Sequence, residues 1–351
     1  MSHSSSLPVL VIFGPTASGK TALADIFFSE KPSIPIPEGI SALLNGRAEI
    51  ISADSMQVYR GMDIGTAKPD RDFRKKLPHH LIDICDPDEQ FCAGDFVRLA
   101  DAACGDIFSR GKMPVVLGGT AFYIKNFLFG LPETPQADAE VRKKLQERAE
   151  KEGIAVLLKE LEAIDPVSAR RIGIHDEYRI IRALEIYAAS GKAQSSFDLP
   201  CHFRTGYLFR VISLDRAREE LYRRIDSRVQ EMVRSGLAGE VSSLVRSGYT
   251  AESSGLRAIG YREFFAVPGA AEKMRSGQDL SDTDIMSVQN LIQRNSRKYA
   301  KRQETFIRPM SGVRHIPADD IMEIYNTVTE FYNLSGLCGT HFLKSGAENV
   351  P

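Results

Sequence analysis

The apolar residues of this chain form short continuous runs, and helical segments separate them. Val9–Phe13 is rich in β-branched side chains, and Glu49–Ser52, Pro114–Gly119 and Tyr207–Leu214 give further strand signals. Runs of this length are typical of parallel strands that are buried on both faces. Together with the helical pattern that follows over Thr21–Phe28, they predict a doubly wound α/β core with a parallel sheet.

The pattern changes between Pro132 and about Arg204. Apolar positions there recur at helical spacing, with charged residues between them and no strand signal. Because a strand-like run resumes at Tyr207, we interpret this piece as an insertion. We therefore expect an α/β catalytic core with C-terminal helices at 1–131 and 206–335, a helical insertion at 132–205, and a loose tail at 336–351.

Composition narrows the class of protein. Charged residues make up 26% and hydrophobic residues 43% of the chain, and the net charge is −1, so we expect a globular protein without a global basic field. The five cysteines form no CxxC pair, which favours free thiols in a reducing compartment. Since no long apolar run or leader pattern occurs, we expect a cytoplasmic protein without a membrane partner.

The strongest chemical signal is GPTASGKT, between the first predicted strand and the first predicted helix. It matches the P-loop pattern, in which backbone N–H groups and a helix N-terminus point at one anion. The lysine adds a charge, and the final threonine is placed to hold Mg²⁺. The expected phosphate-binding residues are Gly14, Pro15, Thr16, Ala17, Ser18, Gly19, Lys20 and Thr21. Kinases, GTPases and other transferases share this motif.

A carboxylate follows the next predicted strand. Asp54 stands where the carboxyl ends of strands line the ligand crevice of a doubly wound sheet. It is a candidate metal-side carboxylate or general base. The alternative is an aspartate that caps the following segment.

Five segments, in this order, closely resemble the bacterial tRNA dimethylallyltransferases: GPTASGKT, DSMQVYRGMDIGTAKP, PHHLIDICDP, GGTAFYIKNFLFG and QRNSRKYAKRQ. The resemblance extends from about Val9 to Arg308. It implies a P-loop core of the nucleoside-triphosphate-hydrolase type with an inserted all-helical domain. It also implies transfer of a dimethylallyl group from dimethylallyl diphosphate to the N6 amine of the adenosine 3′-adjacent to the anticodon, with release of diphosphate.

The resemblance implies roles for single residues. Lys20 and the P-loop would stabilise the departing diphosphate with Mg²⁺ as cofactor, and Asp54 would act on the attacking amine. Thr120 matches a position that contacts the target nucleotide. A family arginine from the segment after Asp215 reaches the diphosphate, and both Arg224 and Arg228 are candidates.

The resemblance also implies contacts to the anticodon stem-loop of tRNA, and the family's usual form suggests a monomer. The matching positions of the core are Asp54, Ser55, Met56, Gln57, Thr120, Arg257, Ala258, Ile259, Gly260, Tyr261 and Arg262. Those of the insertion are Arg142, Tyr178, Arg179, Ile180, Ile181 and Arg182. The pair Arg179 and Arg182, three residues apart, is expected to share a helix face. Arg297 and Lys298 belong to a basic stripe at helical spacing that indicates RNA binding alongside the other motifs.

Three alternatives stay open. The first is a P-loop small-molecule kinase, which the phosphate motif alone supports. The second is an RNA-binding P-loop protein whose nucleotide site is regulatory. The third is a prenyltransferase that acts on free adenine nucleotides, although the arginines of the helical insertion favour a macromolecular acceptor.

Overall fold

The computed structural model describes residues 6–41, 44–135, 138–198 and 200–337. Contacts divide the chain into two compact units, residues 1–128 with 204–351 and residues 129–203. We call them the core unit and the helical unit. The insertion expected at 132–205 overlaps the helical unit almost completely. The tail expected at 336–351 lies outside the described residues except for Gly336 and Leu337.

A parallel sheet of six strands forms the centre of the core unit and confirms the expected α/β class. The strand order is β3-β2-β4-β1-β5-β6. The strands are β1 (Leu7–Phe13), β2 (Ala48–Ala53), β3 (His79–His80), β4 (Met113–Gly118), β5 (Tyr207–Asp215) and β6 (Val313–Pro317). The sequence predicted four of them. It missed β3, which has two residues, and β6, in which Ile316 is the one fully buried side chain, because neither contains an apolar run.

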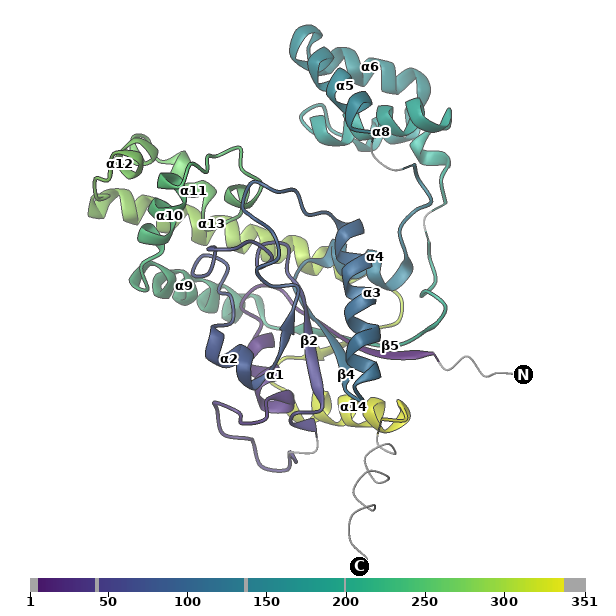
Figure 1. Cartoon of the computed structure of the whole chain (residues 1–351), viewed down its shortest axis with the longest axis vertical. Coiled ribbons are helices and arrows are strands. Elements are labelled where there is room, and N and C mark those ends of the chain that lie inside the picture. Colours follow the sequence, from purple (N-terminus) through teal and green to yellow (C-terminus); the bar gives the residue numbers. More distant parts are fainter. Residues whose placement is uncertain (1–5, 42–43, 136–137, 199, 338–351) are drawn as a thin grey trace, which may run out of the picture. The chain divides into compact units, whose positions relative to one another are not determined.

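Helices cover both faces of the sheet (Figure 1). Side chains alternate along β1, and Leu10 and Ile12 pack with Phe27 and Phe331 in one apolar cluster. Those phenylalanines belong to α1 (Lys20–Phe28) and α14 (Ile321–Leu334). On the other face, α3 (Ala93–Ser109) contacts β1, β2 and β4, and α4 (Ala121–Phe129) packs beside it. The short α2 (Arg71–Lys76) precedes β3.

A group of helices packs against the segment that follows β2. It consists of α9 (Arg218–Arg234), α10 (Leu237–Arg246), the 3₁₀ turn η3 (Gly255–Arg257), α11 (Arg262–Ala266), α12 (Ala270–Ser276) and α13 (Asp282–Ile307). Ile225 and Val229 of α9 and Ile292 of α13 share one buried cluster with Val58 and Met62. Both long helices are therefore held beside Asp54, which precedes Val58 by four residues.

The helical unit has its own core. It contains α5 (Ala139–Glu152), α6 (Ile154–Ile164), α7 (Pro166–Arg171), α8 (Glu177–Ser190) and the 3₁₀ turn η2 (Gln194–Ser196). Leu145, Leu157, Leu161 and Leu184 are buried there at the helical spacing that the sequence shows. The amphipathic pattern thus forms a small helical bundle without strands among its described residues.

The fold predicts that β4 tolerates no side chain at its last residue. A Cβ at Gly118 would lie 2.2 Å from the Ala53 carbonyl oxygen of β2, so Gly118→Ala should lower the free energy of unfolding by about 1–3 kcal/mol. Gly105 is the matched control, because it lies on the exposed side of α3 with no atom within 4 Å of such a Cβ. Gly105→Ala should raise the free energy of unfolding by about 0.5–1 kcal/mol. Urea unfolding measures both changes, and equal effects would contradict the proposed packing.

Candidate active site

The carboxyl edge of the sheet brings the sequence motifs together. Across the sheet, β2 leads to Asp54, β4 to Thr120, β1 to Gly14 and β5 to Arg216. Parallel strands end at the same edge, and ligands of doubly wound sheets bind there. Segments separated by many residues therefore meet because their strands are neighbours.

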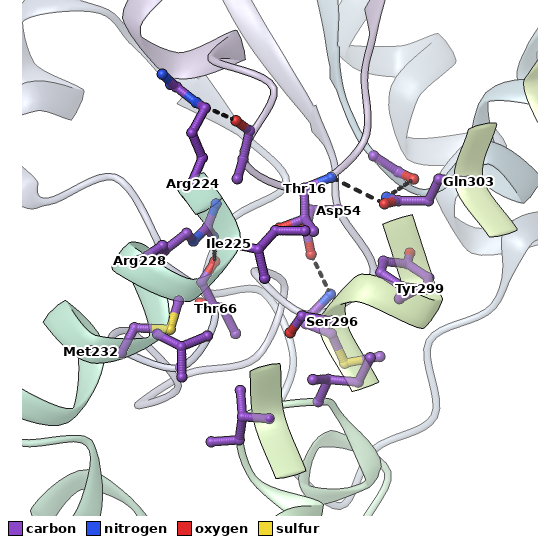
Figure 2. A pocket seen from close by; sticks show the side chains of 18 of the residues that line it. Thr16, Asp54, Thr66, Arg224, Ile225, Arg228, Met232, Ser296, Tyr299 and Gln303 are labelled. Carbon is purple, nitrogen blue, oxygen red and sulfur yellow. Dashed lines mark hydrogen bonds between the residues drawn. The ribbon is translucent and has the colours of Figure 1, made fainter. Parts of the chain in front are cut away.

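A cavity of about 990 Å³ opens at this edge (Figure 2). Its walls come from the P-loop, the segment after β2, α9, the turn around η3, and α13. Of the residues expected from the sequence, it is lined by Thr16, Ala17, Gly19, Lys20, Thr21, Asp54, Ser55, Met56, Gln57, Arg224, Arg228, Arg257, Ala258, Ile259 and Arg262. The anion motif and the acceptor-side motif thus share one cavity.

The P-loop turns back on itself around Lys20. Ala17 and Gly19 have positive φ angles of 63° and 105°, and Lys20 Nζ donates to the carbonyl oxygens of Gly14 at 2.8 Å and Pro15 at 2.9 Å. Burial and the nearby Arg228 guanidinium lower the pKa of Lys20 to about 7, and Asp54 opposes this only in part. The ammonium group is therefore held in a site that favours an additional negative charge.

Arginines from the β5–α9 segment hold the surrounding backbone. Arg224 Nε donates to the Ala17 carbonyl oxygen at 2.9 Å, and Arg228 Nη2 donates to the Thr66 carbonyl oxygen at 3.3 Å. Burial lowers the pKa of Arg228, and Asp54 opposes this shift. Sequence reasoning missed Arg216, whose Nε donates to the Ser18 carbonyl oxygen at 2.8 Å. Its position directly after β5 was the available signal.

Asp54 caps the turn after β2 and also lines the cavity. Its Oδ1 accepts hydrogen bonds from the N–H groups of Met56 at 2.9 Å and Gln57 at 3.3 Å. In Figure 2 the carboxylate lies between Arg228 on one side and Tyr299 on the other. Asp54 therefore does cap the turn, as the alternative interpretation of this residue expected. The capping bonds orient its carboxylate, which faces the cavity.

Thr120 connects the turns after β2 and β4. Its Oγ1 accepts from the Ser55 N–H at 3.0 Å and lies 3.3 Å from Ser55 Oγ. Tyr299 of α13 lines the cavity beside them. Burial and the negative charge of Asp54 raise the pKa of Tyr299 to about 12, although hydrogen bonds with Thr120 and Gln303 oppose the shift. The phenol is therefore a neutral hydroxyl at neutral pH.

The structure corrects the role expected for Tyr261. Its side chain is completely buried, and its hydroxyl donates to Glu240 at 2.6 Å. Glu240 also accepts from the N–H groups of Asp63, Ile64 and Gly65, so this pair fixes the turn that forms one cavity wall. Because Tyr261 packs inward, its side chain supports the site and does not offer a surface to RNA.

Other expected positions differ in their surroundings. Gly260 is buried beside Gly65, and the Gly260 N–H donates to Glu263. On α13, Arg297 forms an ion pair with Asp226, whereas Lys298 is exposed. Arg297, which belongs to the predicted basic stripe, therefore also links α13 to α9.

The helical unit separates its candidate residues into two groups. Arg142 and Arg182 form ion pairs at 3.0 Å and 3.1 Å with Glu185, whose side chain is completely buried. Arg179, by contrast, is 68% exposed. Arg179 and Arg182 stand three residues apart on α8, as expected, but the buried Glu185 carboxylate draws Arg182 toward the core while Arg179 stays exposed.

The remaining three candidates of α8 divide in the same way. Ile180 and Ile181 are buried in the apolar cluster of the helical unit, which corrects their expected contact with tRNA through side chains. The Tyr178 ring is 59% exposed, and the Arg142 guanidinium lies 5.6 Å from its centroid. Tyr178 and Arg179 thus form the accessible part of this group.

Two further observations concern metal and membrane. Within the described ranges, no three His, Cys, Asp or Glu side chains are grouped so that they could hold a metal ion. None of the helices in the described part of the chain combines the length and apolar character needed to cross a bilayer. The cysteines described, Cys85, Cys92, Cys104 and Cys201, are free thiols.

Comparison with curated proteins finds similar chains of nearly the same length. A tRNA dimethylallyltransferase 2 of Geotalea daltonii is 41% identical over 335 residues, which cover 95% of this chain and 94% of that protein. A protein of the same name from Geotalea uraniireducens is 42% identical over 328 residues, covering 93% and 97%.

Solved structures give the same result. The full-length tRNA isopentenylpyrophosphate transferase of Bacillus halodurans has a TM-score of 0.60 and 33% identity, covering 94% of this chain and 98% of that one. A eukaryotic dimethylallyltransferase acting on tRNA has a TM-score of 0.69 and 26% identity, covering 93% and 77%. The family model described as IPP transferase matches residues 57–310. These findings confirm the resemblance seen in the sequence motifs, and the chain belongs to the IPP transferase family.

Proposed function

We propose that this protein is a tRNA dimethylallyltransferase, which transfers a dimethylallyl group from its diphosphate to the N6 amine of the adenosine 3′-adjacent to the anticodon and releases diphosphate. The observation that carries the proposal is a single cavity that joins an anion-binding loop, apolar side chains and the Asp54 carboxylate. Relatives named for this reaction, similar over almost the whole chain, support it.

The diphosphate would bind at the P-loop end. Breaking the allylic C–O bond moves an electron pair onto the diphosphate oxygen, so negative charge grows there in the transition state. Lys20, the loop N–H groups and the guanidinium groups of Arg224 and Arg228 are positioned to stabilise that charge without reorganising.

The P-loop end of the cavity also offers the kind of donor atom that Mg²⁺ binds. The Thr21 hydroxyl lies in the cavity wall next to Lys20, and hydroxyl and diphosphate oxygens are the hard ligands that Mg²⁺ binds. When bound, the ion would neutralise part of the diphosphate charge.

The cavity also suits a small hydrocarbon group. Its lining includes Ile225, Val229 and Met232 of α9, together with Ile259 and Ile292. These side chains would enclose the five-carbon group and exclude water, which otherwise captures an allylic cation. Apolar side chains in the same cavity as the anion loop and Asp54 favour a prenyl donor over the small-molecule kinase alternative.

Asp54 would act on the acceptor. The adenine amine is a weak nucleophile because its lone pair is conjugated with the ring, so a carboxylate that takes its proton during attack on carbon lowers the barrier. The base must leave the stacked anticodon loop to reach this cavity. Ser55, Gln57 and Thr120 surround Asp54 and would orient the extruded nucleotide.

The same proposal also concerns the surface that binds tRNA, the cellular compartment and the oligomeric state. Binding of the anticodon stem-loop would involve the cavity rim, Lys298 on α13, and Tyr178 and Arg179 on the helical unit. We also propose a cytoplasmic monomer, in keeping with the free thiols and a tRNA substrate.

The decisive assay supplies labelled dimethylallyl diphosphate and Mg²⁺ with tRNA or AMP as acceptor, and ATP in a parallel reaction. Label on tRNA is the expected result. Label on AMP alone would favour the free-nucleotide alternative, and ATP turnover without prenyl transfer would favour the kinase.

Removing the carboxylate charge tests the role of Asp54. Asp54→Asn should lower kcat for tRNA prenylation by about 10² or more, since a general base is lost, while tRNA binding in a gel-shift assay stays close to wild type. A wild-type kcat in this variant would remove Asp54 from the proton transfer.

The lowered pKa of Lys20 predicts proton uptake on ligand binding. At about pH 8 the free protein holds Lys20 mostly neutral, and a bound diphosphate raises its pKa, so the amine takes up a proton. Calorimetric titration of inorganic diphosphate in buffers of different ionisation enthalpy measures this uptake. Lys20→Arg is the control, because arginine is always charged. Equal uptake in both proteins would show that Lys20 is not its source.

Two arginines of α8 should behave differently when replaced by alanine. Arg179→Ala should weaken tRNA binding and reduce its salt dependence, with a stability change within about 0.5 kcal/mol. Arg182→Ala leaves buried Glu185 with one partner fewer and should lower the free energy of unfolding by about 1–3 kcal/mol. Gel shifts across salt concentrations and urea unfolding give both values. A loss of stability in Arg179→Ala and a loss of tRNA binding in Arg182→Ala would contradict the roles inferred from the exposure of the two side chains.

A further inference from the structure

The side chain of Gln303 bridges two turns that follow neighbouring strands of the sheet, the P-loop after β1 and the turn after β4. Gln303 lies on α13 and is only 4% exposed. Its Oε1 accepts a hydrogen bond from the Thr16 N–H of the P-loop at 3.0 Å, and its Nε2 donates to the Gly119 carbonyl oxygen at 2.6 Å (Figure 2). One amide therefore bridges the anion loop and the turn that carries Thr120.

The residue at position 119 supports the same contact. Gly119 does not have the positive φ that would require glycine, yet a Cβ there would lie 2.6 Å from Gln303 Nε2. The missing side chain is what lets the amide approach the backbone. Gly119 thus has steric reasons to be glycine, the Gln303 amide and, at 3.3 Å, the Gly14 carbonyl oxygen.

The two bonds require an amide and fix its orientation. The Thr16 N–H needs an acceptor, and the Gly119 carbonyl needs a donor. A carboxylate at this position would satisfy the first group and oppose the second. An apolar side chain would leave both the Thr16 N–H and the buried Gly119 carbonyl oxygen without this partner.

We propose that Gln303 is a positioning residue for prenyl transfer: it holds the diphosphate-binding loop at a fixed distance from the Gly119–Thr120 turn on the acceptor side. The inference rests on the proposed function. The donor carbon and the amine must align closely, and small misplacements cost about 10² in rate. The Thr16 N–H donates to Gln303, and the Ser18 N–H donates to the Pro15 carbonyl oxygen at 3.2 Å, so both groups fix the loop itself.

The test replaces Gln303 by a side chain of similar length without hydrogen bonds. Gln303→Met should lower kcat by about 10² while the KM for dimethylallyl diphosphate changes little, because positioning is lost and the anion groups remain. Gln303→Glu retains the bond from Thr16 but places a negative charge near the diphosphate, so it should also raise this KM. Gln293→Met is the matched control on α13, since Gln293 Nε2 donates to the Asp226 carbonyl oxygen, away from the loop. It should leave both constants near wild type.

A second measurement does not depend on activity. Hydrogen exchange of the Thr16 amide should be faster in Gln303→Met than in the wild type, and unchanged in Gln293→Met, with all samples kept well below their unfolding temperatures. A wild-type exchange rate in Gln303→Met would show that the bridge does not form. Faster exchange with an unchanged kcat would overturn the positioning role alone. A wild-type protein that transfers no prenyl group to tRNA would instead reject the proposed function, whatever the exchange rates.

Discussion

The carboxyl edge of the parallel sheet is the constraint on which the proposed chemistry depends. β2, β4 and β1 are neighbours that run in one direction, so the segments that follow them begin about one strand spacing apart, roughly 4.8 Å. Asp54, Thr120 and the P-loop meet for this reason, and Gly118 shows how closely the backbones approach. The helices then add side chains around groups that the sheet has already brought together.

Two helices complete the site in different ways. Along α9, Arg224 and Arg228 are one turn apart. Arg224 contacts the P-loop backbone at Ala17 and Arg228 contacts the Thr66 carbonyl oxygen, while Ile225, Val229 and Met232 line the same cavity. One helix thus supplies charge for a leaving group and an apolar wall for a hydrocarbon. In contrast, α13 supplies Tyr299 to the acceptor side and Gln303 to the contact between the P-loop and the Gly119–Thr120 turn.

The electrostatics of the free site oppose stability and favour ligand binding. Lys20 and Arg228 lie close together with half-buried side chains, and desolvation lowers the pKa of both groups. Backbone carbonyl oxygens and Asp54 compensate only part of this cost. A polyanion would compensate the rest, which makes the site selective for a highly charged ligand. The helical unit shows a different arrangement, in which the one buried Glu185 carboxylate pairs with both Arg142 and Arg182 and offsets part of their positive charge.

The sequence by itself determined the features whose causes are local. Apolar runs mark the four longer strands, and the P-loop spacing and the position of Asp54 after a strand place both ends of the site, because each depends on neighbouring residues in the chain. Only the tertiary structure decided which side chains are accessible and which ones form contacts between distant segments. Gln303 and Thr16 are 287 positions apart, and Arg182 turns toward a carboxylate on its own helix that the packing has buried. Contacts of this kind leave no periodic pattern, since they depend on which surfaces meet when the helices pack.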